Sequence, residues 1–311
     1  MSELAAAQVL DSLDTLVGPL AYRWLAHDEW AQRSLAELRR QALLTSFVGD
    51  PGRILHCSRF VATDQEIHDL GDGAIPDALA RLAPPECPRS GWHWRADDFG
   101  VLCGWHDAFV HCFLGQGSAP KSYDVHLHLP WNLMLEDITA SGGVIMHTAL
   151  VSSSDCGWLL TAPPSGGKST AIERLPRHWH TLGDDAALVW RTGTGHFAAS
   201  PLPTWGALIG TSETPSRIPQ WRPGESVEIG ACAVLGKAPS DSLQRLPKLV
   251  ALRHVYRAVT EHPHVCTQRR AYRERLFTFA VDFADQVPCW EVHLTPRADA
   301  GPQLEKAFGQ L

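Results

Sequence analysis

One short stretch decides the fold of this chain, Ala162-Pro163-Pro164-Ser165-Gly166-Gly167-Lys168-Ser169-Thr170. It follows the apolar run 157–161 and leads into the segment 171–175, which contains Ala, Ile and Leu. A buried strand, a loop of small residues, Gly-Lys-Ser-Thr and a helix start form the layout of a phosphate-binding P-loop. The sequence therefore predicts an α/β unit that binds a nucleotide through this stretch.

The chemistry of phosphate binding explains each part of the stretch. Consecutive backbone N–H groups in such a loop point at one anion, and the helix N-terminus adds partial positive charge. Lys168 would reach the outer phosphates of ATP, and the Ser169 hydroxyl would ligate Mg²⁺. The predicted nucleotide-binding residues are Ala162, Pro163, Pro164, Ser165, Gly166, Gly167, Lys168, Ser169 and Thr170.

The stretch departs from the strict pattern G-x-x-x-x-G-K-[ST], because Ala162 stands where the first glycine is expected. Ser165 and the two prolines also make the loop stiffer than usual. An alternative interpretation is a turn that merely caps a helix, with Ser169 or Thr170 as the capping hydroxyl. Pro176 predicts a short helix that ends within about two turns.

A pair of acids, Asp184-Asp185, follows sixteen residues after Lys168 and precedes the apolar run 186–190. Phosphoryl transfer needs Mg²⁺ to neutralise the phosphates and a carboxylate to orient or deprotonate the acceptor. Two consecutive loop residues point different ways, so one acid can face the metal and the other the acceptor. The alternative is a pair of solvated turn residues.

Three basic residues are further candidates for the phosphate site. His147 lies between two predicted strands and could sit beside the phosphates, or it could be a hydrogen-bonded strand-end histidine. Arg217 and Lys237 are cations in predicted loops. Either of them could contact a phosphate, but we expect both to be solvated at the surface. A metal site at His126-Leu127-His128 is a weaker hypothesis, because no third ligand lies nearby in the sequence.

The bulk composition excludes several classes of protein. The net charge of −7 over 311 residues argues against a general nucleic-acid binder. We expect neither a membrane span, since no apolar run approaches about 20 residues, nor a secretory signal. Eight cysteines without a C-x-x-C pair predict buried free thiols in a reducing cytoplasm.

The pattern along the chain predicts two domains, 1–140 and 141–311, with a boundary at Ser141-Gly142-Gly143. Apolar spacing predicts two helices in the first ~45 residues, divided at Gly18-Pro19, with Asp28 as an N-cap. Short strands are expected over 100–103, 108–113 and 123–129. In the second domain we expect strands over 144–147, 149–152, 157–161, 186–190, 229–235 and 289–294, and helices over 245–260, 268–285 and 302–310.

The segments 143–147, 159–162, 167–170 and 183–185 resemble the catalytic domains of HPr kinase/phosphorylases in order and spacing. A closer resemblance is to the HPr-kinase-related proteins called SynChlorMet cassette protein C. The residues that carry it are Arg174-Leu175-Pro176, Trp179, Leu182, Asp184-Asp185 and Pro203-Thr204-Trp205, with the ending 287–292 followed by a terminal helix. The resemblance covers roughly 141–311.

The resemblance implies an α/β (α+β mixed) fold, in which an HPr kinase C-terminal-like P-loop domain is preceded by a smaller α+β N-terminal domain. It implies that Lys168 and Ser169 bind the phosphates and Mg²⁺, that Asp184 is the catalytic base, and that Asp185 is a metal or supporting carboxylate. His147 would be the upstream active-site histidine. It also implies a role in peptide-modification gene cassettes. Because HPr kinases form homo-oligomers, it further implies that this chain could form a homo-oligomer.

These features predict a cytoplasmic ATP- and Mg²⁺-dependent kinase that phosphorylates a Ser or Thr hydroxyl of a precursor peptide or small protein. The chain lacks the downstream Glu-x-Arg-Gly motif of HPr kinases, since Glu228-Ile229-Gly230 has no arginine in place. HPr itself is therefore not the expected substrate. The alternatives are a non-catalytic nucleotide-binding scaffold that delivers a peptide to a partner enzyme, and a small-metabolite kinase.

Overall fold

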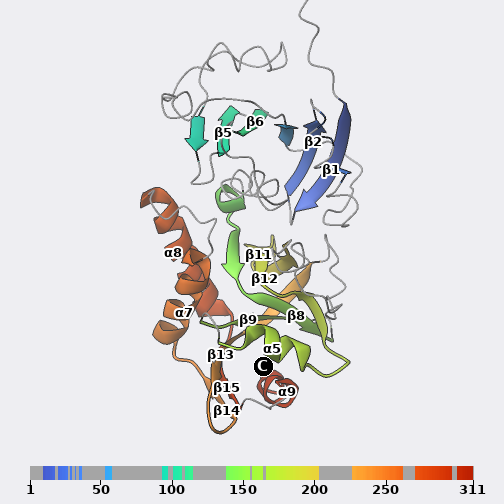
Figure 1. Ribbon diagram of the computed structural model, residues 1–311. Helices are drawn as coiled ribbons and strands as arrows, with labels where there is room; N and C mark the ends of the chain where they lie inside the picture. The colour runs from blue at the N-terminus through green and yellow to red at the C-terminus, as the bar shows by residue number, and fades with distance from the viewer. Residues whose placement is uncertain are drawn as a thin grey trace, which may run out of the picture. The chain divides into compact units, whose positions relative to one another are not determined.

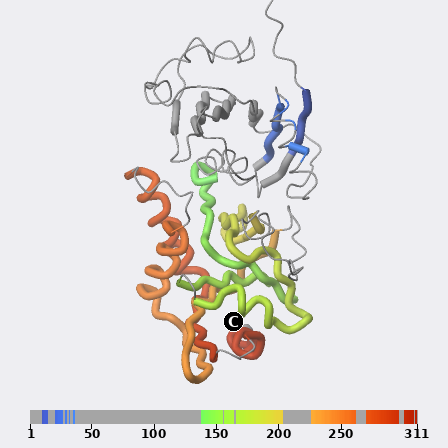
Figure 2. Tube along the Cα trace, in the orientation of Figure 1, coloured from blue at the N-terminus to red at the C-terminus, as the bar shows by residue number. Residues whose placement is uncertain are grey.

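The computed structural model describes somewhat more than half of the chain; Figure 1 draws its helices and strands, and Figure 2 traces the Cα path in the same orientation. The described residues are 10–17, 20–26, 29, 32, 35–36, 53–57, 93–96, 101–106, 109–114, 138–154, 156–163, 166–202, 226–261, 270–295 and 300–310. The chain forms two compact units, Met1–Met134 and Leu135–Leu311. None of the helices in the described ranges is long and apolar enough to cross a membrane.

The N-terminal unit contains a six-stranded sheet with the order β1-β2-β3-β6-β5-β4. Its strands are β1 (Asp11–Val17), β2 (Leu20–Ala26), β3 (Arg53–Cys57), β4 (His93–Ala96), β5 (Val101–His106) and β6 (Phe109–Leu114). Strands β2, β3 and β6 run parallel, whereas β1, β4 and β5 pair antiparallel with their neighbours. The strands predicted over 100–103 and 108–113 are confirmed as β5 and β6.

The helix predicted before Gly18-Pro19 is wrong over its described part, because residues 11–17 form β1 and pair with β2 in register from Asp11↔Ala26 to Val17↔Leu20. Burial along β2 alternates strictly, with Tyr22, Trp24 and Ala26 inside, as in a strand with one buried face. The Arg23 guanidinium also donates two hydrogen bonds to the Asp14 carboxylate of β1, at 2.8 and 2.9 Å. Cross-strand pairing therefore overrides the helix-like spacing of the leucines.

The second predicted helix of this unit is described at four residues. The described residues of the second predicted helix, namely 29, 32, 35 and 36, are helical, so that helix is confirmed where it is described. The predicted strand 123–129 and the two histidines at 126 and 128 lie outside the described residues.

The C-terminal unit is built on a nine-stranded mixed sheet, which confirms the expected mixed α/β class. Its main path is β10-β8-β9-β13-β12-β11-β7, and β15 pairs with both β13 and β14. The strands are β7 (Val144–His147), β8 (Ala149–Ser153), β9 (Cys156–Thr161), β10 (His180–Gly183), β11 (Ala186–Arg191), β12 (Phe197–Pro201), β13 (Val227–Lys237), β14 (Ser242–Arg245) and β15 (Cys289–Leu294).

The long strand β13 organises this sheet. It runs parallel to β9 along one edge, and along its other edge it pairs first with β12 and then, in parallel, with β15. The last pair between β13 and β9 is Val234↔Thr161. Parallel strands end at the same edge of a sheet, so the chain leaves Thr161 toward the predicted P-loop beside the last residues of β13.

Helices cover both faces of this sheet, as Figure 1 shows. They are α5 (Lys168–Glu173), α7 (Lys248–Thr260), α8 (Arg270–Gln286) and α9 (Gly301–Phe308). Leu159 of β9 packs in the core that contains α7 and α8, whereas Trp158 and Leu160 pack in the core that contains α5 and α9. This burial on both faces explains why β9 is continuously apolar in the sequence.

Most predicted elements of this unit are confirmed within a few residues, including the short helix before Pro176, which ends at Glu173. The structure adds three strands that we did not predict, β10, β12 and β14. Cys156, Cys232 and Cys289 are free thiols as expected.

We expect Phe283→Ala to lower the free energy of unfolding by about 3–5 kcal/mol, the usual cost of removing a buried aromatic ring. Phe283 of α8 has no exposed surface and lies 5.0 Å from Phe197 and 6.0 Å from Phe279 between ring centroids. Phe277→Ala is the matched control, because that side chain on the same helix is 50% exposed. Urea unfolding measures both variants, and equal losses would contradict this account of the core.

Candidate functional site

Two glycines, Gly166 and Gly167, allow the tight turn of the loop between β9 and α5. The Gly166 N–H donates to the Pro163 carbonyl oxygen at 2.8 Å, and Gly167 adopts φ +94°, a left-handed conformation that side-chain-bearing residues rarely adopt. Lys168 then begins α5, whose Ala171 N–H donates to the Gly167 carbonyl oxygen at 2.8 Å. Pro164 and Ser165 lie outside the described residues.

The structure shows how the alanine at position 162 fits into the loop. A Cβ placed on Gly166 would lie 2.8 Å from the Ala162 Cβ and 2.7 Å from the Pro163 oxygen. The methyl group of Ala162 therefore occupies the space that the absent side chain of Gly166 leaves. The departure from the strict motif is accommodated within the loop, provided that position 166 stays glycine.

We expect Gly166→Ala to destabilise the protein by about 1–3 kcal/mol, the usual cost of forcing extra atoms into a packed site. Gly193→Ala is the matched control, because a Cβ there meets nothing within 4 Å and the substitution also reduces the entropy of the unfolded chain. Urea unfolding should show a loss for the first variant and little change or a gain for the second. Equal stability of the two variants would rule out the tight closure of the loop.

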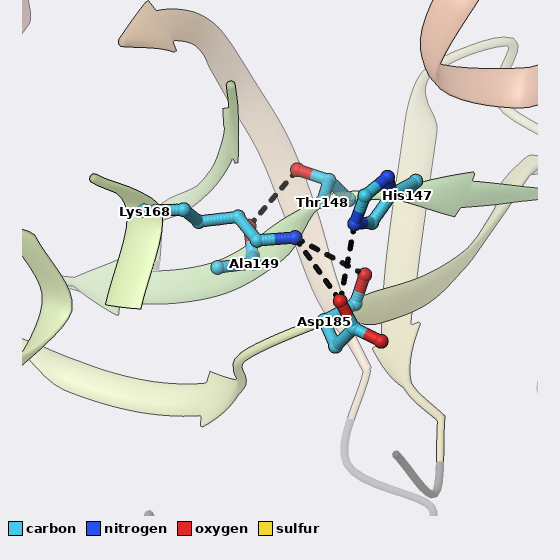
Figure 3. Close-up of polar contacts among 5 residues, drawn as sticks. All are labelled: His147, Thr148, Ala149, Lys168 and Asp185. Carbon is cyan, nitrogen blue, oxygen red and sulfur yellow. Dashed lines mark hydrogen bonds and ion pairs between the residues drawn. The ribbon is translucent and has the colours of Figure 1, made fainter. Parts of the chain in front are cut away.

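Three of the predicted site residues meet in one cluster, which Figure 3 shows. The Lys168 Nζ lies 3.3 Å from the Asp185 Oδ1 and 3.5 Å from the Asp185 carbonyl oxygen. The His147 Nε2 lies 3.1 Å from the same Oδ1. One carboxylate oxygen thus contacts both an ammonium and an imidazole that come from different elements.

Sheet register and the start of α5 bring these residues together. His147 is the last residue of β7 and pairs with Ala186, the first residue of β11, so Asp185 lies next to His147. The Thr148 N–H donates to the Asp185 carbonyl oxygen at 3.0 Å and fixes the turn into β11. Lys168 reaches the same point from the first residue of α5.

The surroundings shift the pKa values of Asp185 and Lys168. The hydrogen bond from His147, followed by the charge of Lys168, holds the pKa of Asp185 well below its usual range despite partial burial. Burial lowers the pKa of Lys168, an effect opposed by the charges of Asp185 and Asp184. Asp185 is therefore ionised near neutral pH, and the charge of Asp184 acts on the same lysine. The Lys168 side chain is only 12% exposed, so its charge is poorly screened by water.

The remaining predicted residues lie next to this cluster in the chain. Asp184 is half-buried directly after β10, and Ser169 and Thr170 are exposed in the first turn of α5. The sequence interpretation gave Asp184 and Asp185 different roles, and the structure distinguishes them too, because Asp185 is the acid that contacts Lys168 and His147. The catalytic and metal-binding roles themselves stay predictions.

The oxygen atoms at this site would bind Mg²⁺ only together with oxygens of a bound phosphate. In the part of the chain that the structure describes, no group of three or more His, Cys, Asp or Glu side chains could hold a metal ion. Mg²⁺ commonly takes one or two protein oxygens and completes its shell with substrate phosphates and water. The Ser169 hydroxyl and the Asp185 carboxylate are oxygen donors of this kind, so the residues present fit such a shared site.

The sequence could not show that Asp185 is the acid that contacts both Lys168 and His147, because two adjacent aspartates cannot be distinguished by residue type. The signal that could have found it was the pairing of 144–147 with 186–190, which depends on strand order. Arg217, the other candidate cation besides Lys237, lies outside the described residues.

The comparison with known proteins agrees with the closer of the two resemblances seen in the sequence. No curated protein matches the chain. A family model described as SynChlorMet cassette protein ScmC matches residues 112–308, which is more than half of the chain. The match includes the loop between β9 and α5 and the cluster of His147, Lys168 and Asp185. The chain therefore belongs to the SynChlorMet cassette protein ScmC family.

Proposed function

We propose that this protein is an ATP- and Mg²⁺-dependent kinase with an HPr kinase-like P-loop domain. It transfers the γ-phosphoryl group to a Ser or Thr hydroxyl of a peptide or small protein. The observation that carries the proposal is the contact of Lys168, directly after the glycine-rich loop, with Asp185 at 3.3 Å. A lysine at this position with a carboxylate beside it is the arrangement that phosphate and Mg²⁺ binding require.

The binding half of the proposal uses residues of the loop and of the first turn of α5. Lys168 neutralises the outer phosphates, and its contact with Asp185 holds the ammonium at the site before nucleotide binds. Ser169 and Asp185 supply oxygen ligands for Mg²⁺, and the ion when bound neutralises charge on the phosphates. His147 orients the Asp185 carboxylate through the 3.1 Å contact.

The chemical half of the proposal assigns Asp184 as general base. The acceptor hydroxyl loses its proton to the Asp184 carboxylate, its oxygen forms a bond to the γ-phosphorus, and the bond from that phosphorus to the bridging oxygen breaks to release ADP. The contacts with Lys168 and His147 are made by the adjacent acid, Asp185. The charge of Asp184 acts on Lys168, which supports a position beside the phosphates.

The proposal of a peptide as the acceptor starts from the description of the family as a cassette protein. A cassette protein works with the products of neighbouring genes, so we propose a ribosomal precursor peptide in the cytoplasm as the substrate. We assign its recognition to the N-terminal domain, residues 1–140. HPr kinases form homo-oligomers, and we propose the same capacity for this chain.

The test is mass spectrometry of the cassette's precursor peptide after incubation with this protein, ATP and Mg²⁺. The proposal expects a mass gain of one phosphate on a Ser or Thr, which depends on both ATP and Mg²⁺. Binding of ATP without phosphorylation of any cassette peptide would replace the kinase with a nucleotide-binding scaffold. Phosphorylation of a small metabolite alone would remove the peptide from the proposal.

A further inference from the structure

Two exposed apolar side chains lie on the helix pair α7–α8, which covers one face of the C-terminal sheet (Figure 1). Leu249 of α7 is 81% exposed and Phe277 of α8 is 50% exposed, and Leu10 is the only other large hydrophobic side chain exposed to this degree among the described residues. The Phe277 ring packs edge-on against Tyr256 of α7, with 5.7 Å between ring centroids. The two helices therefore present apolar side chains to solvent at a shared boundary.

An arginine accompanies these side chains on each helix. Arg253 lies four residues after Leu249 and three before Tyr256, so the three share one face of α7. Arg273 lies four residues before Phe277 and shares its face of α8. Both arginines are exposed, and neither forms an ion pair within the described residues. We call these five residues the α7–α8 patch.

The opposite faces of both helices are fixed in the core, so the patch is presented on a rigid surface. An ion pair of 2.9 Å between Lys248 and Asp285 also joins the first residue of α7 to the end of α8. A ligand would meet a preformed surface here, which is the usual case for docking between folded partners. The side chains that the two helices bury are Ala251, Val255, Ala258 and Val259 of α7 and Leu276, Phe279, Ala280, Phe283 and Ala284 of α8.

The charge around the patch indicates the chemistry of its ligand. The chain as a whole carries a net charge of −7, but α7 contains three lysine or arginine residues and no acid, and 270–277 contains three arginines and one acid. Arginine pairs with carboxylates through two hydrogen bonds, and its apolar stem packs on neighbouring hydrophobic groups. A contiguous surface of this mixed kind marks a protein interaction site.

An acidic polypeptide fits this surface better than a nucleic acid does. Binding of single-stranded nucleic acid depends on aromatic rings for base stacking and on a basic surface that follows the phosphate backbone. The aliphatic Leu249, which is the most exposed apolar side chain of the patch, offers no ring for stacking. The net charge of the whole chain also opposes an extended phosphate backbone.

We propose that the α7–α8 patch docks an acidic segment of a partner protein, in which large apolar side chains lie between the carboxylates. Arg253 and Arg273 pair with the carboxylates, and Leu249 and Phe277 contact the apolar side chains. No residue of the loop between β9 and α5 takes part. The inference therefore goes beyond the proposed function and holds whether or not the protein is a kinase.

A peptide selection tests the chemistry of the ligand without assuming its sequence. A phage library of short random peptides is first depleted on the full-length double variant Arg253→Glu/Arg273→Glu and then selected on the full-length wild type. We expect the enriched peptides to contain more Asp and Glu than the library, together with Phe, Tyr, Trp or Leu. Failure to enrich any peptide, or enrichment without an excess of acids, would overturn the inference.

Fluorescence anisotropy with the most enriched peptide then measures single substitutions in the full-length protein. Arg273→Glu should weaken binding by about tenfold or more, because attraction becomes repulsion. Phe277→Ala should have an effect of similar size, about tenfold, through loss of an aromatic anchor. Arg275→Glu is the matched control, because this exposed arginine lies two residues from both positions and so on the opposite side of α8. Equal weakening by Arg273→Glu and Arg275→Glu would reduce the effect to general charge attraction and overturn the docking site.

Two other occupants of the patch give different results. Tighter binding of a short single-stranded RNA than of the peptide, abolished by Arg273→Glu, would make the ligand a nucleic acid. A wild-type dimer that Phe277→Ala dissociates in analytical ultracentrifugation would place a second copy of this chain on the patch. Either result would overturn the partner segment. Thermal unfolding of each variant should match the wild type, because the substituted side chains are exposed.

Discussion

Lys168→Ala is expected to reduce phosphate incorporation into the peptide by at least about 10²–10³-fold, the usual cost of removing one preorganised group that stabilises transition-state charge. The lysine is mostly buried, and its charge is held beside Asp185 at 3.3 Å. Water cannot easily replace it, because little solvent reaches the position. Incorporation of radiolabelled phosphate from ATP measures the effect directly.

The control for this prediction must separate catalysis from folding. Asp185 keeps its contact with His147 in Lys168→Ala, so we expect thermal unfolding close to that of the wild type. Lys248→Ala removes a lysine of similar size from an exposed ion pair and should keep full activity, since such pairs contribute little. Full incorporation by Lys168→Ala would remove the lysine from the mechanism. The alternative of a capping hydroxyl from Ser169 or Thr170 is wrong, because Gly167 is the N-cap of α5 and no side chain caps this helix.

Asp184→Asn is expected to lower kcat by about 10²–10⁴-fold, the range for loss of a general base. Asparagine has nearly the same shape, so the turn before β11 should persist. The KM for ATP should change little, because the acid acts on the acceptor hydroxyl. Steady-state kinetics with varied ATP and varied peptide measure both constants.

Asp185→Asn is the matched comparison, because it changes the adjacent acid by the same atoms. Asp185 contacts Lys168 and His147, so its loss should raise the Mg²⁺ concentration needed for half-maximal activity and weaken ATP binding. The two variants should therefore differ in which constant changes. A fall in kcat for Asp185→Asn together with normal kinetics for Asp184→Asn would exchange the two roles.

Local sequence patterns were sufficient to predict β9 and the helix that follows it. The apolar run 157–161 and the Gly-Lys-Ser-Thr after it located β9 and the short helix α5. Both faces of β9 are covered, so its hydrophobic signal was strong. In contrast, residues 11–17 have helix-like leucine spacing but form β1, because their stability depends on pairing with β2, and no local signal reports that pairing.

The sequence by itself determined the chemical inventory of the site, namely a small-residue loop, a lysine, a following pair of acids and an upstream histidine. These signals are local, since each depends on residue type and short spacing. The tertiary structure decided which acid contacts the lysine, because the β7–β11 register brings His147 to Asp185. It also brought the Lys237 Cε to 3.4 Å from the position that a Cβ on Gly167 would occupy, across 70 residues of chain. Parallel pairing of β9 with β13 creates that proximity, and strand order between distant segments depends on the packing of the whole sheet.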